Sequence, residues 1–65
     1  MNFITYKEHA PVNRDQVIYF YRERHSVKFV TSSNTMVWDL DSEDEAKYVF
    51  NELRIRTEII RNYKE

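Results

Sequence analysis

The stretch DLDSEDE at residues 39–45 holds five acidic side chains, the ligand type that calcium prefers. A calcium loop of the EF-hand kind needs Gly at its sixth position and a bidentate Glu at its twelfth. Numbered from Asp39, these positions hold Asp44 and Phe50. Numbered from Asp41, they fall inside a predicted helix. The sequence therefore predicts no metal site. A helix that begins within the acidic run is a better explanation of the five acidic residues.

The histidines and serines show no catalytic arrangement. His9 falls in a predicted loop and His25 at a predicted hairpin tip, without the spacing of metal ligands or of a catalytic dyad. Ser26, Ser32 and Ser33 fall in predicted turns, where short hydroxyl side chains stabilise the backbone. We therefore predict no catalytic residue, no enzymatic activity and no small-molecule substrate.

Two residue types are absent, and each absence excludes several kinds of site. Without Cys there are no disulfides, thiolate nucleophiles, Cys-type zinc sites or iron–sulfur clusters. Without Gly there are no P-loops, dinucleotide-binding glycine turns or nucleophile elbows. We expect no cofactor. No apolar run resembles a secretory signal or a membrane span, so we expect an intracellular, cytoplasmic protein with no membrane partner.

Aromatic and basic residues lie together around the first predicted hairpin. They are Tyr19, Tyr21, Arg22, Arg24 and Lys28. Aromatic side chains on a sheet stack on bases while Arg and Lys contact phosphates, so single-stranded nucleic-acid binding is the alternative function. The formal net charge of −1 is not the strongly basic balance typical of nucleic-acid-binding domains. The simpler interpretation is that the tyrosines are partly covered sheet residues and the arginines are solvated.

Three segments rich in β-branched and aromatic residues predict strands over residues 16–23, 26–32 and 35–40. Their connections are short enough only for hairpins, which predicts an antiparallel meander. Pairing Arg22 with Val27 and Phe29 with Trp38 places seven residues on one sheet face: Ile18, Phe20, Val27, Phe29, Met36, Trp38 and Leu40. The opposite face carries Val17, Tyr19, Tyr21, Lys28, Val30, Val37 and Asp39. In this register Tyr21, Lys28 and Asp39 form one row.

Residues 2–7, NFITYK, are apolar enough to supply a fourth strand, and the polar stretch around Pro11 then forms a loop. Four strands followed by a helix is an order similar to that of the whirly-type single-stranded-DNA-binding proteins. That resemblance is in element order only, with no shared motif, and it implies dimerisation through the C-terminal helix.

A helix is predicted to begin after Leu40. Ser42 and Glu45 match a capping box, and the acidic residues stabilise the positive end of the helix dipole. Apolar residues then recur at helical spacing, and we assign this stripe to the sheet: Ala46, Val49, Phe50, Leu53, Thr57 and Ile60. We expect this helix to extend to about Tyr63.

The same helical projection places a second apolar stripe on the opposite side: Tyr48, Ile55, Ile59 and Tyr63. A helix that is apolar on two sides is normally buried on two sides. Three explanations remain open. Two copies of the chain pack these stripes together, a foreign protein receives the stripe in a groove, or residues 2–14 fold back over Ile55 and Ile59.

We therefore predict a single α+β domain over residues 1–65. It comprises an N-terminal strand or loop at 1–15, an antiparallel meander of three or four strands at 16–40 and a long helix at 42–63 that covers one sheet face. The predicted function is a small non-catalytic protein–protein interaction module, homodimeric, that binds and occludes or modulates a partner protein. Heavy use of Phe, Tyr, Met, Ile, Asn and Lys is typical of AT-rich coding, and by association it indicates a phage, mobile-element or low-GC bacterial source. A small Gly-free and Cys-free protein of this composition suits a phage or mobile-element modulator of a host factor.

Overall fold

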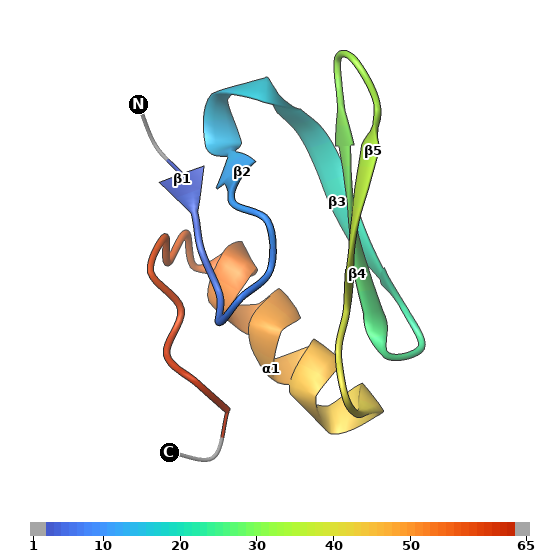
Figure 1. Ribbon diagram of the computed structural model, residues 1–65, viewed down its shortest axis with the longest axis vertical. Coiled ribbons are helices and arrows are strands. Elements are labelled where there is room, and N and C mark those ends of the chain that lie inside the picture. Colours follow the sequence, from blue (N-terminus) through green and yellow to red (C-terminus); the bar gives the residue numbers. More distant parts are fainter. Residues whose placement is uncertain (1–2, 64–65) are drawn as a thin grey trace.

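The computed structural model describes residues 3–63 and shows an α+β domain. Three antiparallel strands form the main sheet in the order β3-β4-β5, and α1 packs against one of its faces (Figure 1). The bounds of these elements are Val17–Glu23 for β3, Ser26–Thr31 for β4, Thr35–Asp39 for β5 and Glu43–Arg54 for α1. Two short strands and a 3-10 turn precede them: β1 Phe3–Ile4, β2 Val12–Asn13 and η1 Arg14–Gln16. The α+β class, the meander and the C-terminal position of the helix are confirmed.

The first hairpin has the predicted register over most of its length, with Arg22 opposite Val27 and Phe20 opposite Phe29. A β-bulge lies at the start of β3, where Val17 faces Thr31 and the pairing resumes at Tyr19. The extra residue is Ile18. A bulge reverses the side to which the preceding residues point. The prediction for the first two residues of β3 was therefore wrong, because Val17 packs against the core and Ile18 is 67% exposed.

The second hairpin is shifted by two residues from the predicted register. Val27 faces Trp38 and Phe29 faces Met36, so the predicted pairing of Phe29 with Trp38 was wrong. The cause is a tight turn in which the Thr31 amide donates to the carbonyl oxygen of Asn34 at 2.8 Å. A shift of two residues leaves every side chain on its original face. The predicted core face therefore persists despite the change in pairing.

The N-terminal residues form a separate two-stranded sheet. β1 pairs with β2, with Phe3 opposite Asn13 and Ile4 opposite Val12. The strand predicted over residues 2–7 is therefore not a fourth strand of the meander; Asn2 itself lies outside the described residues. The Trp38 indole Nε1 donates to the carbonyl oxygen of Ala10 at 2.9 Å, which joins the β1–β2 segment to β5.

The helix begins as predicted, because the Ser42 side chain accepts a hydrogen bond from the Glu45 amide at 3.1 Å. It ends at Arg54, so the predicted extent of 42–63 was wrong at its C-terminal end. Arg56 adopts a left-handed conformation with φ 66°. Its amide donates to the Leu53 carbonyl and the Thr57 amide donates to the Glu52 carbonyl, both at 3.0 Å. These two bonds define a Schellman C-cap, with Arg56 in the place that Gly usually takes.

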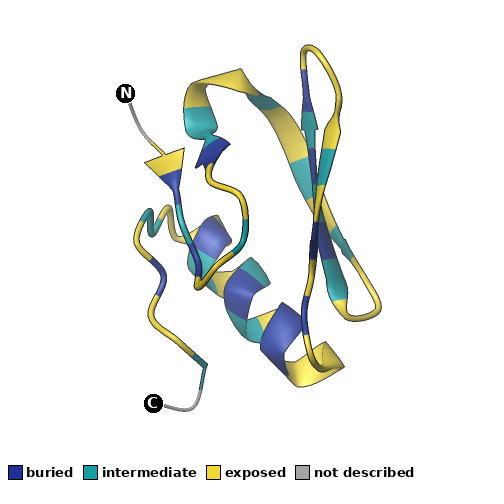
Figure 2. Ribbon diagram, viewed as in Figure 1, coloured by how far each residue is buried: buried dark blue, intermediate teal, exposed yellow. Residues whose placement is uncertain are grey.

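Beyond this cap, residues 57–63 turn back and run beside the residue that follows β1; we call them the returning segment. The Thr5 amide donates to the carbonyl oxygen of Glu58 at 2.8 Å, and the Ile60 amide donates to that of Thr5 at 3.0 Å. Ile60 is 4% exposed, so the C-terminal segment supplies a core residue without being helical. The core residues come from both sheets, the helix, the adjoining loops and this segment, and Figure 2 shows buried positions on α1 and on the strands on either side of it. They are Ile4, Tyr6, Val12, Val27, Phe29, Trp38, Leu40, Ala46, Val49, Leu53 and Ile60.

The predicted sheet-facing stripe of the helix is correct over its helical part. Ala46, Val49 and Leu53 are buried, and Phe50 is half-buried, with its ring edge against Phe20 at a centroid distance of 5.4 Å. Within residues 3–63, no helix is long and apolar enough to cross a membrane.

Candidate interaction surface

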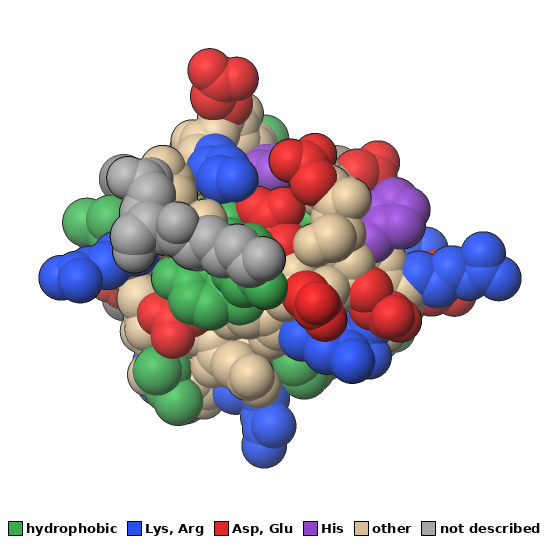
Figure 3. Space-filling view, turned by 90° about the horizontal axis from the view of Figure 1, so that it is seen from below, with side chains coloured by type: hydrophobic (Ala, Val, Ile, Leu, Met, Phe, Trp, Pro, Cys, Tyr) green, Lys and Arg blue, Asp and Glu red, His purple; other side chains and the backbone are tan. Residues whose placement is uncertain are grey.

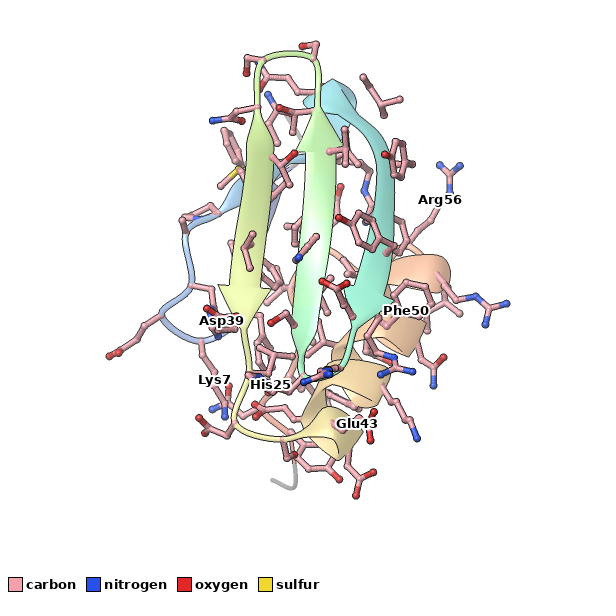
Figure 4. All side chains as sticks on the ribbon, turned by 90° about the vertical axis from the view of Figure 1, so that its right-hand side faces the viewer. Lys7, His25, Asp39, Glu43, Phe50 and Arg56 are labelled. Carbon is pink, nitrogen blue, oxygen red and sulfur yellow. The ribbon has the colours of Figure 1, made fainter. Side chains whose placement is uncertain are left out.

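The face of the main sheet that points away from α1 carries large apolar side chains. Figure 4 looks onto this open face, with the helix behind the strands. Tyr19 is 56% exposed, Tyr21 38% and Val37 47%. The register places Tyr21, Lys28 and Val37 in one cross-strand row. Antiparallel sheets with one solvated face usually carry polar residues there, so this face departs from the usual pattern.

The two tyrosines of this face stack on each other, with ring centroids 6.1 Å apart and planes inclined by 28°. The Lys28 ammonium lies 6.0 Å from the centre of the Tyr21 ring. It also forms an ion pair of 2.6 Å with the Glu23 carboxylate. That hydrogen bond raises the pKa of Lys28 and lowers the pKa of Glu23. The charge of Lys28 is therefore largely matched by a neighbour on the same strand pair.

The predicted row of Tyr21, Lys28 and Asp39 is not formed, because of the register shift in the second hairpin. Val37 takes the place of Asp39 beside Lys28. Asp39 instead faces Ser26, whose hydroxyl donates to its carboxylate at 2.6 Å. The shift makes the row around Tyr21 more apolar than the sequence indicated.

The five residues of the predicted nucleic-acid surface do not lie together. Tyr19, Tyr21 and Lys28 share the open face. Arg22 extends toward the helix, where its Nη1 lies 3.5 Å from the Glu43 carboxylate and donates to the Arg24 carbonyl at 2.8 Å. Arg24 forms the hairpin tip with φ 56°. Of the five predicted residues, only the two tyrosines and Lys28, which is paired with Glu23, lie on the open face.

The four residues of the predicted second helix stripe have different surroundings. Ile55 caps the helix and is 71% exposed, whereas Ile59 lies in the returning segment and is 81% exposed. Tyr48 is on the helix, its hydroxyl donates to the Arg61 carbonyl at 2.8 Å, and its ring lies 5.4 Å from that of Tyr63. Because the helix ends at Arg54, these residues do not form one helical face. Thr5 pairs with the returning segment, but Ile55 and Ile59 remain exposed.

A groove of about 670 Å³ lies between the start of β3 and the end of α1. This groove was not predicted from the sequence, because its position depends on where the helix ends. Its lining combines apolar residues with three arginines and one acid: Ile4, Arg14, Asp15, Val17, Ile18, Tyr19, Phe20, Leu53, Arg54 and Arg56. The only available signal was the repeated arginine in LRIR at residues 53–56.

The opposite end of the molecule is acidic. Acidic side chains gather around a hollow near the start of α1, seen from below in Figure 3, and Glu8, Asp39, Asp41 and Glu45 contribute to its lining. Among residues 3–63, no group of three or more His, Asp or Glu side chains is arranged to hold a metal ion. Of these residues Glu45 lies in the first turn of α1, where the positive end of the helix dipole stabilises acidic side chains.

Glu45 has a role that the sequence did not reveal. It is 4% exposed, and its carboxylate accepts hydrogen bonds from the Tyr6 hydroxyl, from Lys7 Nζ at 2.9 Å and from the Asp41 amide at 3.1 Å. Burial raises the pKa of Glu45, but the bonds from Tyr6 and Lys7 outweigh it and hold the pKa below its usual value. Burial and the bond to Glu45 raise the pKa of Tyr6. This network joins the helix start to the segment after β1, which is a structural role.

No protein-family model, curated protein or solved structure matches this chain. The predicted element order of the whirly-type proteins is not fully formed either, because β1 pairs with β2 and does not add a fourth strand to the meander.

Proposed function

We propose that this protein is a small non-catalytic interaction module that presents the open face of its sheet to another polypeptide. The observation that carries the proposal is the exposure of Tyr19, Tyr21 and Val37 on one continuous face. Adjacent exposed apolar residues on a small domain are typical of a protein interaction site, whereas single exposed ones are ordinary. Tyr in particular is enriched in protein interfaces, because it combines a large apolar ring with a hydroxyl.

Around the open face, the distribution of charge favours a protein partner over a nucleic acid. Lys28 is paired with Glu23, and Arg22 is turned toward Glu43. Nucleic-acid binding needs cations that are available to neutralise phosphates, and its affinity falls steeply with salt. An apolar contact through Tyr19 and Val37 depends little on salt. The two arrangements that we propose are a second copy of the chain packed against the open face and a host protein bound in the cytoplasm by a phage-type modulator.

The proposal is tested by affinity capture from a lysate of the source cells, with and without nuclease, together with analytical ultracentrifugation of the purified protein. The test variants are Tyr19→Glu and Val37→Glu, which place charge on the open face. The matched control is Ile59→Glu, which places the same charge at an apolar residue elsewhere that is even more exposed. All three variants are first checked for native circular dichroism.

We expect both open-face variants to lose a nuclease-resistant protein partner, or to shift a dimer to monomer, while Ile59→Glu behaves as wild type. Loss of binding in Ile59→Glu alone would overturn the proposal in favour of the residues predicted from the helix stripe. Capture that disappears with nuclease would favour nucleic-acid binding.

A further inference from the structure

β3 is the longest strand of the sheet and lies at its edge. It pairs with β4 on one side, and among residues 3–63 no backbone hydrogen bond from another strand reaches its other side. Alternate residues of such a strand direct their N–H and C=O groups away from the sheet, where another strand can bind them. Natural edge strands are usually protected by Pro, Lys or inward charges. Val17 to Tyr21 carry none of these; the bulge at Ile18 interrupts only the beginning of the edge.

The groove between the start of β3 and the end of α1, which we call the arginine groove, lies beside this edge. Phe20 and the buried Leu53 contribute apolar surface to it. Its charged residues are Arg14, Arg54, Arg56 and Asp15, which give three positive charges and one negative, a sum of +2.

Two of these arginines have no carboxylate partner in the part of the chain that the structure describes. Arg14 lies 3.7 Å from the Glu58 carboxylate, whereas Arg54 and Arg56 form no ion pair within residues 3–63. In Figure 4, Arg56 projects from the end of the helix past the outer edge of β3. A strand added to β3 would run beside it.

From this juxtaposition we propose that β3 and the arginine groove bind an extended acidic segment of a partner protein. The segment adds to the free edge of β3 through backbone hydrogen bonds, and its carboxylates contact Arg54 and Arg56. This inference rests on the proposed function, because it names the chemistry of the partner polypeptide.

The alternation of side chains along a strand defines the partner further. Side chains of the added strand that point to the helix side meet the arginines. Those that point to the other side extend the open face beside Tyr19 and Tyr21. The best-fitting segment therefore alternates acidic and apolar residues. Strand addition of this kind gains affinity from the main chain and specificity from alternate side chains.

A second copy of the chain fits this site poorly. Pairing β3 with β3 around a two-fold axis would bring both copies of Arg54 and Arg56 to the same interface, and facing like charges oppose association. Nucleic acid would use the arginines but not the free backbone groups of β3. The charge and the strand edge together favour an acidic extended peptide.

The test uses a fluorescein-labelled peptide of alternating Val and Glu, with fluorescence anisotropy of the full chain as the readout. The variants are Arg54→Glu, Arg56→Glu and their combination. Lys47→Glu is the matched control, because it makes the same charge change on an exposed residue of the same helix outside the groove. Peptides with N-methyl groups on one or the other alternate set of amides test for strand addition. A labelled single-stranded oligonucleotide and a Val/Lys peptide complete the probes.

We expect saturable binding of the Val/Glu peptide, a loss of about tenfold or more for each arginine variant, and little change for Lys47→Glu. One N-methylated peptide should lose binding, and the other should keep it. Three results would each overturn the inference: no binding of the Val/Glu peptide, equal binding of the Val/Lys peptide, or equal tolerance of both N-methylated peptides. Tighter binding of the oligonucleotide would overturn it in favour of nucleic acid.

The two proposals fail independently. If Val37→Glu, an open-face variant outside the arginine groove, loses a protein partner while the arginine variants keep it, the interaction module stands and the acidic-strand inference fails. If the arginine variants lose the peptide and no nuclease-resistant partner or dimer is found, the site exists but the proposed use of the open face is wrong.

Discussion

Replacing Arg56 with Gly should stabilise the protein, although the substitution removes a whole side chain. Arg56 occupies the left-handed region at φ 66°, where the Cβ of an L-residue meets the neighbouring carbonyl oxygen. That conformation costs about 1–2 kcal/mol for a residue other than Gly. Gly loses about 0.5–1 kcal/mol more backbone entropy on folding. The expected net gain is about 0.5–1 kcal/mol, or a rise of roughly 2–8 °C in Tm for a domain of this size.

Two further variants isolate the cause. Arg56→Ala removes the guanidinium but keeps Cβ in the left-handed conformation, so the difference between Gly and Ala at this position reports the backbone alone. Arg54→Gly makes the same substitution within the helix. There Gly should destabilise by about 1 kcal/mol. The opposite sign at two neighbouring arginines is the distinctive expectation.

The measurement is thermal and urea unfolding followed by circular dichroism, at high salt to screen the interaction of Arg56 with the helix dipole. If Arg56→Gly is no more stable than Arg56→Ala, the Schellman cap described here is incorrect. Stabilisation by Arg54→Gly would mean that the helix ends earlier than residue 54. Either result would refute the account of why this helix is short.

Three further predictions concern the core and its surroundings. Tyr6→Phe should destabilise the protein by about 1–3 kcal/mol in urea unfolding, because the buried Glu45 carboxylate loses a hydrogen-bond donor. Tyr48→Phe removes an exposed hydrogen bond and should cost less than about 1 kcal/mol. The pKa of Glu45 is lower in the folded protein than in the unfolded chain, so its contribution to the free energy of unfolding is complete above the unfolded pKa and is lost as pH falls through the folded pKa. Glu45→Gln should therefore flatten the acid part of the curve of stability against pH. An unchanged curve would contradict this. Ile60→Ala should lower the free energy of unfolding by about 2–5 kcal/mol because Ile60 is buried, whereas Ile59→Ala should change it by no more than about 0.5 kcal/mol because Ile59 is exposed. Equal costs would show that the returning segment does not pack against the core as described.

The sheet was predictable because its signal is local. Alternating apolar residues assign side chains to faces, and faces survive a register shift of two residues. That is why Phe29 and Trp38 were correctly placed in the core while their pairing was wrong. The bulge at Ile18 was not predictable, because one inserted residue changes no composition and no spacing in β4.

The helix end was missed for a different reason. A Gly at the C-cap is the usual stop signal, and this chain has no Gly. Left-handed positions are taken by Lys7, Arg24 and Arg56 instead. With no stop signal visible, Ile59 and Ile60 continued the helical spacing by coincidence. The hydrogen-bond partners of Glu45 could not be predicted from local sequence patterns either, because Tyr6 lies 39 residues away in the sequence.

The two candidate surfaces share β3, and this links the proposals physically. The domain covers its core with the N-terminal strands and the returning segment, both of which lie on the helix side of the main sheet. That arrangement leaves β3 with a free edge, with Tyr19 and Tyr21 on one side of the strand and Arg54 and Arg56 beside the other. A single partner strand at this edge would contact both sides at once, because its side chains alternate between them. An open-face variant and an arginine-groove variant should therefore weaken such a partner non-additively, and a double-mutant cycle of Tyr21→Ala, which lies outside the groove, with Arg56→Ala would measure the coupling. Strict additivity would indicate two separate binding sites.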